Sequence, residues 1–229
     1  MNGGASGAGT VVAIDGPAGS GKSSVARAAA AALGFRFLDT GAAYRAVAWY
    51  GAETAADLDD PAVVAALADE LDFEEALDPA EHWVRSGGQD ITTAIREPRI
   101  SAIVSKVSTV QPARDALNER FRRIIADAAP GIVVEGRDIT TVVAPDADVR
   151  VLLTAAPEVR AARRHKDLEA AGDDADHAAV LAAIAERDRK DSTLVEFLSA
   201  APGVRTVDST HLDFDETVNA VVALVRSRG

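Results

Sequence analysis

The stretch TVVAIDGPAGSGKSSVARAAAAALG, residues 10–34, is the part of the sequence that decides the fold. It opens with TVVAIDG, a short β-branched run that ends in glycine, which is the pattern of a buried strand. It closes with KSSVARAAAAALG, which is rich in strong helix formers and stops at Gly34. Between these parts, GPAGSGKS at residues 16–23 matches G-x-x-x-x-G-K-[ST] at every fixed position. A strand, a glycine-rich loop and a helix in this order predict a phosphate-binding loop.

The residue types in this loop explain how it would bind phosphate. Glycines allow consecutive backbone N–H groups to turn inward around a phosphate chain, and the N-terminus of the helix adds positive potential. Lys22 would reach the outer phosphates, and Ser23 would be a ligand of Mg²⁺, with waters bridging the ion to Asp15, Glu135 or Asp138. We expect the phosphates to bind to residues Gly16, Pro17, Ala18, Gly19, Ser20, Gly21, Lys22, Ser23 and Ser24.

Further strands and helices alternate along the chain. The runs RFLD, GIVVEG, VRVLL and VRTVD each read as a short strand, and helical segments separate them. This alternation predicts an α/β fold with a five-stranded parallel sheet that is covered on both faces. Residues 71–91 break the rhythm with Pro79 and a Gly87-Gly88 pair, and they predict a small antiparallel meander. We expect a disordered tail over residues 1–9 and a single domain over 10–226, with an insert at about 71–95 and a short lid at about 160–186.

Composition narrows the partners and the compartment. The formal net charge is −12. A protein that binds duplex DNA or RNA needs a basic surface, so this charge argues against such a partner. The sequence has no cysteine, which excludes disulfides and thiolate chemistry and fits a reducing compartment. No apolar run approaches the roughly 18 to 20 residues that a membrane helix needs. The four histidines show no metal-ligand spacing. We expect a cytoplasmic protein with no nucleic-acid and no membrane partner.

A phosphate loop alone is compatible with a switch GTPase, a motor ATPase or a small-molecule kinase. The chain has neither an N-K-x-D guanine-reading motif nor a D-x-x-G switch motif, which disfavours the GTPase. A kinase whose acceptor is itself a phosphate needs arginines outside the loop to neutralise that charge. Arg45 and Arg137 follow the carboxyl ends of predicted strands, where open α/β sheets bind ligands. A third group, Arg160, Arg163 and Arg164, lies on the helix that enters the predicted lid.

Four segments resemble the bacterial cytidylate kinase family, in the same order and at similar spacing. They are AIDGPAGSGKSSVARAAAAALGFRFLDTGAAYRAV, AIREPRISAIVSKVSTVQPARDAL, IVVEGRDITTVVAPDADVRVLLTA and ERDRKDS. The resemblance extends from Val11 to about Val225, and the FLDTGAAYR and VVEGRDITTVV elements are specific to that family among phosphate-loop kinases. It implies a monomeric phosphotransferase that moves the γ-phosphoryl group of MgATP to CMP or dCMP.

The same resemblance implies roles for individual residues. It assigns the phosphate of CMP to Arg45 and Arg137 with Tyr44 and Thr40 beside them, and cytosine to Ser105, Arg114 and Asp138. It places Arg187 and Asp191 near the ribose and phosphates, and it makes Arg163 and Arg164 lid arginines that close over ATP. The residues implied in catalysis are Lys22, Arg137, Arg164 and Arg187.

The assignment of the base-reading residues also has a physical basis. Cytosine offers an N4 amino donor beside N3 and O2 acceptors, whereas uracil turns its O4 acceptor toward the same position. A carboxylate at Asp138 with donors at Arg114 and Ser105 therefore fits cytosine. The alternatives are structural: an ion pair between Asp138 and Arg137, a buried helix position for Ser105, and an i,i+4 pair of Arg187 with Asp191.

Two residues depart from the family pattern. Leu194 stands where the family usually has an arginine, so one contact with the acceptor phosphate is expected to be missing. Thr140 replaces the glycine that is common in GRDxGT. Two other functions stay open at this point, namely a kinase for another small acceptor such as shikimate and a nucleotide-dependent switch with slow hydrolysis.

Overall fold

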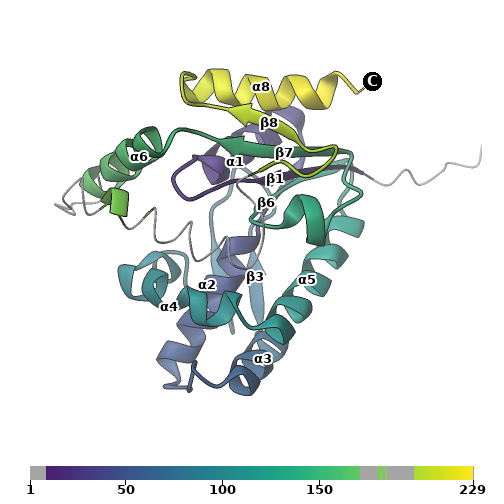
Figure 1. Cartoon of the computed structure of the whole chain (residues 1–229). Helices are drawn as coiled ribbons and strands as arrows, with labels where there is room; N and C mark the ends of the chain where they lie inside the picture. The colour runs from purple at the N-terminus through teal and green to yellow at the C-terminus, as the bar shows by residue number, and fades with distance from the viewer. Residues whose placement is uncertain (1–8, 171–179, 183, 185–198, 229) are drawn as a thin grey trace, which may run out of the picture. The chain divides into compact units, whose positions relative to one another are not determined.

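A computed structural model of the chain describes residues 9–170, 180–182, 184 and 199–228 (Figure 1). Its main sheet is parallel, with the strand order β2-β6-β1-β7-β8. The register pairs Val12 of β1 with Val149 of β7, and Val151 of β7 with Arg205 of β8. The strands are β1 (Thr10–Asp15), β2 (Arg36–Asp39), β6 (Gly131–Gly136), β7 (Val149–Thr154) and β8 (Arg205–Asp208), which confirms all the strands predicted for this sheet.

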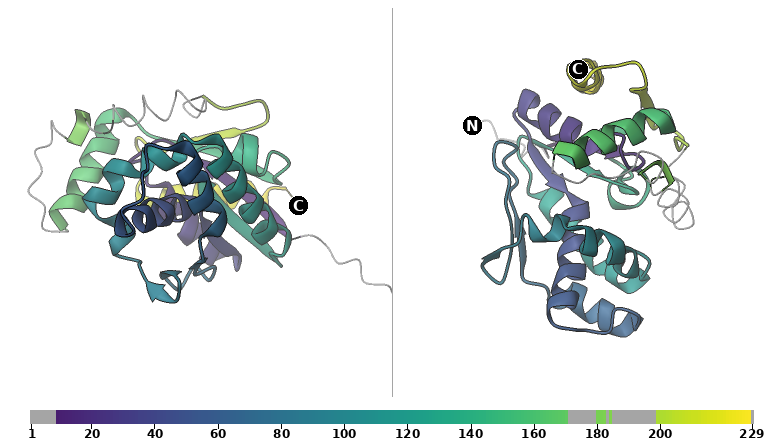
Figure 2. Two further views of the ribbon diagram at one scale, coloured as in Figure 1. Left: turned by 90° about the horizontal axis from the view of Figure 1, so that it is seen from below. Right: turned by 90° about the vertical axis from the view of Figure 1, so that its left-hand side faces the viewer.

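The described residues form two compact units. One unit comprises residues 11–33 and those described from 133 onward. It contains most of the sheet, with α1 (Lys22–Leu33), α6 (Pro157–Ala170) and α8 (Phe214–Arg226). The buried residues of α1 are Val25, Ala26, Ala29 and Ala30, and α1 packs on α8 (Figure 2).

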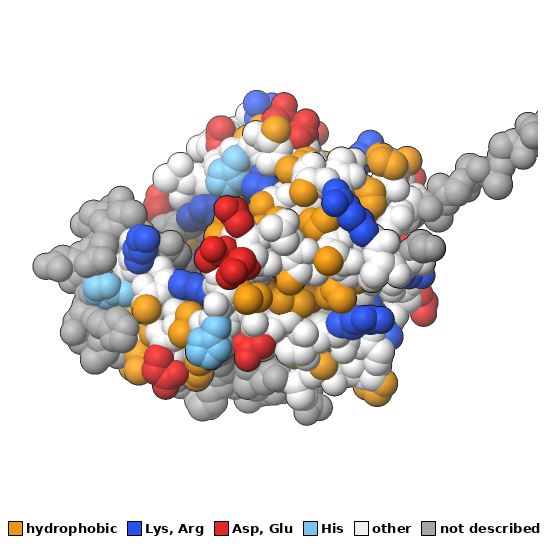
Figure 3. Space-filling view, turned by 90° about the horizontal axis from the view of Figure 1, so that it is seen from above, with side chains coloured by type: hydrophobic (Ala, Val, Ile, Leu, Met, Phe, Trp, Pro, Cys, Tyr) orange, Lys and Arg blue, Asp and Glu red, His pale blue; other side chains and the backbone are white. Residues whose placement is uncertain are grey.

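The helix α8 closes this unit on the outside. Asp213 and Glu216 form a capping box at its start, since each side chain accepts from the backbone N–H of the other residue. Asp215 adds a third carboxylate to the same end of the helix. Figure 3 shows the molecule from the side on which α8 is drawn in Figure 1, and on this face acidic and basic side chains are interspersed.

The other unit comprises the described residues up to Thr10 together with 34–132. In it α2 (Thr40–Glu53) packs on α4 (Pro98–Ser108), and α3 (Pro61–Glu70) packs on α5 (Gln111–Ala126). A small antiparallel sheet with the order β3-β4-β5 follows α3, formed by β3 (Phe73–Glu75), β4 (Val84–Ser86) and β5 (Gln89–Asp90). Gly87 and Gly88 make the turn between β4 and β5 with φ angles of 56° and 76°. The meander predicted for residues 71–91 is therefore confirmed.

A π-helix, Ile139–Val143, follows β6 and was not predicted from the sequence. Its wide turn is defined by bonds from Val143 N to Asp138 O (3.2 Å) and from Ala144 N to Ile139 O (2.8 Å). Single π-helical turns of this kind occur frequently at functional sites. This one directly follows Arg137 and Asp138, both of which are predicted site residues.

The predicted lid falls only partly within the described residues. The helix α6 occupies its first part, and Val180 and Ile184 pack against Ala161 of that helix. Residues 171–179, 183 and 185–186 of the predicted lid, and residues 1–8 of the predicted tail, lie outside the described residues. The domain boundaries thus stay a prediction. Among the described residues, no helix is long and apolar enough to cross a membrane.

Candidate active site

The predicted strand, loop and helix are present at residues 10–33, and three glycines shape the loop. Gly19 and Gly21 have φ angles of 74° and 81°, which L side chains rarely adopt. Gly16 is constrained by space instead, because a Cβ there would lie 2.2 Å from the carbonyl oxygen of Leu153. The loop therefore needs glycine at each of these positions of the phosphate-binding motif.

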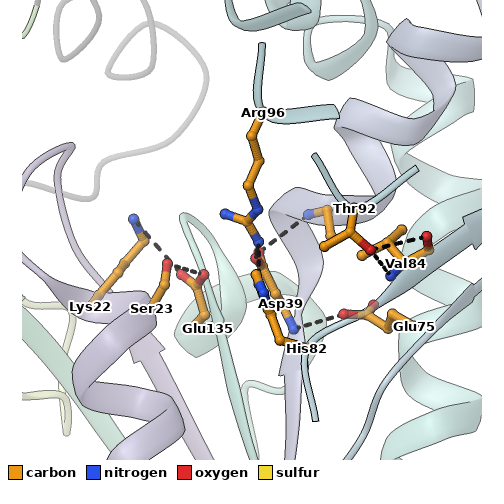
Figure 4. A network of polar contacts seen from close by, with 10 residues as sticks. Lys22, Ser23, Asp39, Glu75, His82, Val84, Thr92, Arg96 and Glu135 are labelled. Atoms are coloured by element: carbon orange, nitrogen blue, oxygen red, sulfur yellow. Dashed lines mark hydrogen bonds and ion pairs between the residues drawn. The ribbon is translucent and has the colours of Figure 1, made fainter. Parts of the chain in front are cut away.

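Glu135 joins the two polar side chains at the start of α1 (Figure 4). The hydroxyl of Ser23 donates to Glu135 Oε1 at 2.5 Å, and Lys22 Nζ lies 3.8 Å from Glu135 Oε2. Glu135 projects from β6 and is 2 % exposed, so its charge depends on these partners. One buried carboxylate thus orients both the ammonium group that would reach the outer phosphates and the hydroxyl that would be a ligand of Mg²⁺.

The segment after β6 contacts the beginning of the phosphate loop. Arg137 NH1 donates to Gly16 O at 2.9 Å. The carboxylate of Asp15 accepts from Ile139 N at 2.8 Å on one oxygen, and from Thr140 N at 2.9 Å and Thr140 Oγ1 at 2.6 Å on the other. Burial raises the pKa of Asp15, and the bonds from Thr140 and Ile139 and the charge of Lys22 offset only part of that increase.

The helix α6 holds the outer side of the phosphate loop through two arginines. Arg160 is 6 % exposed and donates from Nε to Ala155 O at 3.1 Å and from NH1 to Ala18 O at 2.9 Å. Arg163 NH1 donates to Ser20 O at 3.3 Å. The two guanidinium groups thus bind carbonyl oxygens of the loop from its outer side. This arrangement is compatible with backbone N–H groups of the loop that are directed inward, toward a phosphate.

Arg163 also contacts the segment that follows β8. Its NH1 donates to Ser209 Oγ at 3.0 Å and its NH2 to Ser209 O at 2.8 Å. Arg164, the next residue, is exposed. The two predicted lid arginines therefore differ, since the guanidinium of Arg163 binds backbone carbonyls of its own unit and that of Arg164 is accessible to solvent.

The predicted acceptor residues Thr40, Tyr44 and Arg45 all lie in the first turns of α2. Thr40 begins the helix and is buried, after the N-cap residue Asp39. The ring of Tyr44 packs at 6.3 Å from that of Phe121, tilted by 54°. Arg45 NH1 donates to Ser101 Oγ of α4 at 2.9 Å. The bond to Ser101 fixes one edge of the guanidinium.

The two predicted base-reading residues of this unit lie on α4 and α5. Ser105 is half-buried on α4, and its carbonyl accepts from Thr109. Arg114 is half-buried on α5 and donates from NH1 to Ser108 O at 3.1 Å. Asp138, the third predicted base-reading residue, belongs to the other unit and is 5 % exposed.

An ion pair next to α2 was not predicted. Arg96 NH2 lies 3.4 Å from Asp39 Oδ2 and 3.2 Å from His82 Nε2, and Asp39 N donates to Glu75 Oε2 at 3.2 Å (Figure 4). Asp39 also caps α2 by accepting from Ala42 N. Arg96 falls in one of the family-like segments of the sequence, but nothing in its local pattern distinguishes it from a solvated surface charge.

The donors present in the loop fit the triphosphate of a nucleotide with its magnesium ion. The hydroxyl of Ser20 is 1 % exposed and has no hydrogen-bond partner among the described residues, so an acceptor in the loop would satisfy it. Within the described part of the chain, no group of three or more His, Cys, Asp or Glu side chains forms a metal site independent of such a ligand. Arg187, Asp191 and Leu194 lie outside the described residues.

Comparison with known proteins identifies relatives that match nearly the full length of the chain. The family model for cytidylate kinase matches residues 12–227. A cytidylate kinase of Cutibacterium acnes is 49 % identical over 216 residues, which cover 94 % of this chain and 95 % of that protein. A cytidylate kinase of Streptomyces avermitilis is 40 % identical over 219 residues, which cover 95 % of this chain and 93 % of that protein.

One solved structure supports the fold. An uncharacterized protein from Eubacterium ventriosum superposes with a TM-score of 0.56 at 11 % identity, and the match covers 95 % of this chain and 99 % of that one. At that identity the likeness concerns only the fold.

Proposed function

The chain belongs to the cytidylate kinase family, and on that premise we propose how its residues transfer the γ-phosphoryl group of ATP to CMP or dCMP. The reaction gives ADP and CDP or dCDP. The observation that carries the assignment of the ATP site is the glycine loop with Lys22 and Ser23 both joined to the buried Glu135.

ATP is the phosphoryl donor in this proposal, and its phosphates bind to residues 16–24. Backbone N–H groups of the loop and the ammonium group of Lys22 stabilise the negative charge that moves between phosphates during transfer. Ser23 provides a ligand for Mg²⁺, and Glu135 orients that hydroxyl. When bound, Mg²⁺ neutralises charge on the phosphate oxygens. Arg164 adds positive charge from α6, and Arg163 supports the loop through Ser20 O.

The acceptor needs charge neutralisation more than a general base. The phosphate of CMP is largely dianionic at pH 7, because its second pKa is about 6, so the attacking oxygen already lacks a proton. We assign this phosphate to Arg45 and Arg137, with Thr40 and Tyr44 beside it, and we assign Arg187 and Asp191 to the ribose and phosphates. The bond that Arg45 donates to Ser101 supports the first assignment, because it holds this guanidinium in one orientation near the start of α2, where the bidentate geometry of arginine suits a phosphate.

Cytosine is assigned to Asp138, Arg114 and Ser105. The carboxylate of Asp138 would accept from the N4 amino group, and Arg114 and Ser105 would donate to the ring acceptors. Uracil would instead place its O4 acceptor against the carboxylate of Asp138. Discrimination between the two bases thus rests on a charged group that repels the wrong one.

We further propose that the enzyme is a monomer in the cytoplasm with small-molecule substrates and no nucleic-acid or membrane partner. The net charge of −12 supports the proposed lack of a nucleic-acid partner, and a sequence without cysteine fits the reducing cytoplasm. The monomer follows from the family pattern, and size-exclusion chromatography with light scattering measures it directly.

A coupled assay of ADP formation tests the substrate assignment. The acceptors CMP, dCMP, UMP, AMP and shikimate are compared at fixed MgATP, and the expected result is ADP release that depends on CMP or dCMP. Lys22→Ala should lower kcat by about 100-fold or more, because it removes a charge that acts on the transferred group. Arg226→Ala is the matched control, since Arg226 is an exposed cation on α8. Stimulation by shikimate alone, or ADP release indifferent to every acceptor, would contradict the assignment.

A further inference from the structure

The contact between Asp15 and the start of the π-helix spans more than 120 positions of sequence. Asp15 ends β1, directly before the phosphate loop, whereas Ile139 and Thr140 begin the π-helix after β6. Two backbone N–H groups and one hydroxyl donate to the carboxylate, so both of its oxygens are occupied by protein donors. Asp15 therefore acts as a distant N-cap of the π-helix.

This contact holds the two residues that precede the π-helix. Arg137 NH1 donates to Gly16 O, and Ile139 N and Thr140 N donate to Asp15. Asp138 thus lies between Arg137, which is bonded to Gly16, and Ile139, which is bonded to Asp15. Its side chain belongs to a backbone that is fixed on both sides.

Thr140 contributes a donor that depends on its side chain. Any residue other than proline would donate its backbone N–H at this position, but the hydroxyl of Thr140 adds a second donor to Asp15 Oδ2 at 2.6 Å. Thr140 is 3 % exposed and Asp15 is 3 % exposed, so water does not replace that donor readily. Arg150 holds the same residue from β7 by donating to Thr140 O at 3.3 Å.

We propose that Thr140 is a positioning residue for the acceptor site. Its hydroxyl fixes the start of the π-helix on Asp15, which sets where Asp138 and Arg137 stand and so sharpens the choice of cytosine over uracil. This inference rests on the proposed base-reading role of Asp138. Both carboxylate oxygens of Asp15 accept from this segment, so we assign Asp15 a role that acts through Thr140.

The test compares the ratio of kcat/KM for CMP to that for UMP among variants of the full chain. Thr140→Val keeps the shape and removes the hydroxyl, and we expect the CMP-to-UMP ratio to fall roughly three- to ten-fold, with KM for ATP unchanged within about two-fold. Thr140→Ser keeps the hydroxyl and should restore the ratio to within about two-fold. Thr141→Val is the matched control on an exposed neighbour and should leave the ratio unchanged. Asp138→Asn serves as the reference for base reading.

The outcomes separate this inference from the proposed function. If Asp138→Asn lowers the CMP-to-UMP ratio of kcat/KM and Thr140→Val does not, the positioning role of Thr140 is wrong and base reading by Asp138 stands. If Thr140→Val lowers this ratio and Asp138→Asn does not, Thr140 positions the segment that contains Arg137 and Asp138, and a group other than Asp138 reads the base. An unchanged ratio in both variants overturns both ideas.

If Thr140→Val does not fold, a milder substitution can be used for the same test. Thr140→Ala removes the same hydroxyl without adding an apolar branch next to Asp15. A soluble Ala variant whose activity falls equally for CMP and UMP shows a purely structural role and overturns the inference. Thermal unfolding of each variant establishes that the compared proteins are folded.

Discussion

At the level of single residues, the contacts of Glu135 link the chemistry of the loop to a buried charge. A carboxylate that is 2 % exposed and accepts from Ser23 is oriented before any ligand arrives. Orienting partners of metal ligands typically contribute 10- to 100-fold in affinity or activity. The acid is therefore expected to act through Ser23 and Lys22 rather than on the acceptor.

Glu135→Gln tests this role. The amide keeps the shape but loses the charge that attracts Lys22 and orients Ser23, so we expect kcat to fall about 10- to 100-fold and the Mg²⁺ concentration for half-maximal activity to rise. Steady-state kinetics over a magnesium titration measures both. Glu119→Gln, an exposed acid on α5, is the control. An unchanged magnesium dependence would exclude the orienting role.

Ser101 is a second residue whose role appears only in the structure. Ser101→Ala removes the acceptor of Arg45 NH1 and frees the guanidinium to adopt other rotamers. We expect KM for CMP to rise about three- to ten-fold with little change in KM for ATP, because one hydrogen bond to a charged group is lost. Ser101→Thr keeps the hydroxyl and should stay close to the parent protein. Equal kinetics for the Ala and parent proteins would show that Arg45 needs no support from α4.

The raised pKa of Asp15 predicts how stability depends on pH. Burial is the main cause, and the bonds from Thr140 and Ile139 and the charge of Lys22 oppose it. Nearby, Arg137 donates to Gly16 O, Arg150 donates to Thr140 O, and Glu135 pairs with Lys22. Since the native state binds this proton more tightly than the unfolded chain does, Asp15 favours folding below its unfolded pKa of about 3.9. That contribution is lost as the pH rises through the folded pKa.

Thr140→Val should strengthen this dependence. Removing the hydroxyl donor raises the pKa of Asp15 further, so the loss of unfolding free energy should be greater at pH 7, where the carboxylate must be charged, than at pH 4.5. Urea unfolding at the two pH values measures it. The Thr141→Val protein should show no such difference. An equal loss at both pH values would mean that the hydroxyl does not act on the charge of Asp15.

At the level of elements, α6 supports the phosphate loop through buried guanidinium groups. Arg160→Met removes donors from Ala155 O and Ala18 O inside the protein, which we expect to cost about 2–3 kcal/mol. The midpoint of thermal unfolding should then fall by roughly 4–12 °C, and KM for ATP should rise. Arg164→Met changes an exposed arginine of the same helix and should lower kcat with little change in the midpoint. The reverse pattern in the two variants would contradict this division of roles.

Local patterns in the sequence predict most of these elements. The strand before Gly16, the helix after it and the turn at Gly87-Gly88 each follow from neighbouring residues, and the structure confirms all of them. The π-helix could not be predicted, because Asp15 stabilises its start from a distant strand. For the same reason nothing local identifies the acceptor of Arg45 or the carbonyl partners of Arg163.

At the level of the whole molecule, Asp148 joins β1 to the residues that follow α8. Its carboxylate accepts from Val11 N at 2.7 Å and pairs with Arg228 at 2.5 Å, so residues 217 positions apart in sequence share one acid. Burial raises the pKa of Asp148, but the bonds from Arg228 and Val11 outweigh it and the pKa is lowered overall. The acid therefore stabilises the fold while it is charged.

Arg228→Gln tests whether this tie between the chain ends stabilises the fold. Because the folded pKa of Asp148 is lowered, its contribution is present above the unfolded pKa of about 3.9 and is lost as the pH falls through the folded value. The side chains of Arg228 and Asp148 are 51 % and 36 % exposed, so solvent screening limits the pair to less than about 1 kcal/mol. We expect the unfolding midpoint to fall by up to about 4 °C at pH 7 in low salt, and less in 1 M NaCl. The difference should shrink as the pH is lowered below about 3.9 and should be lost once the pH is below the folded pKa of Asp148. A deficit that persists in acid or in high salt would assign the effect to packing of the arginine side chain instead of its charge.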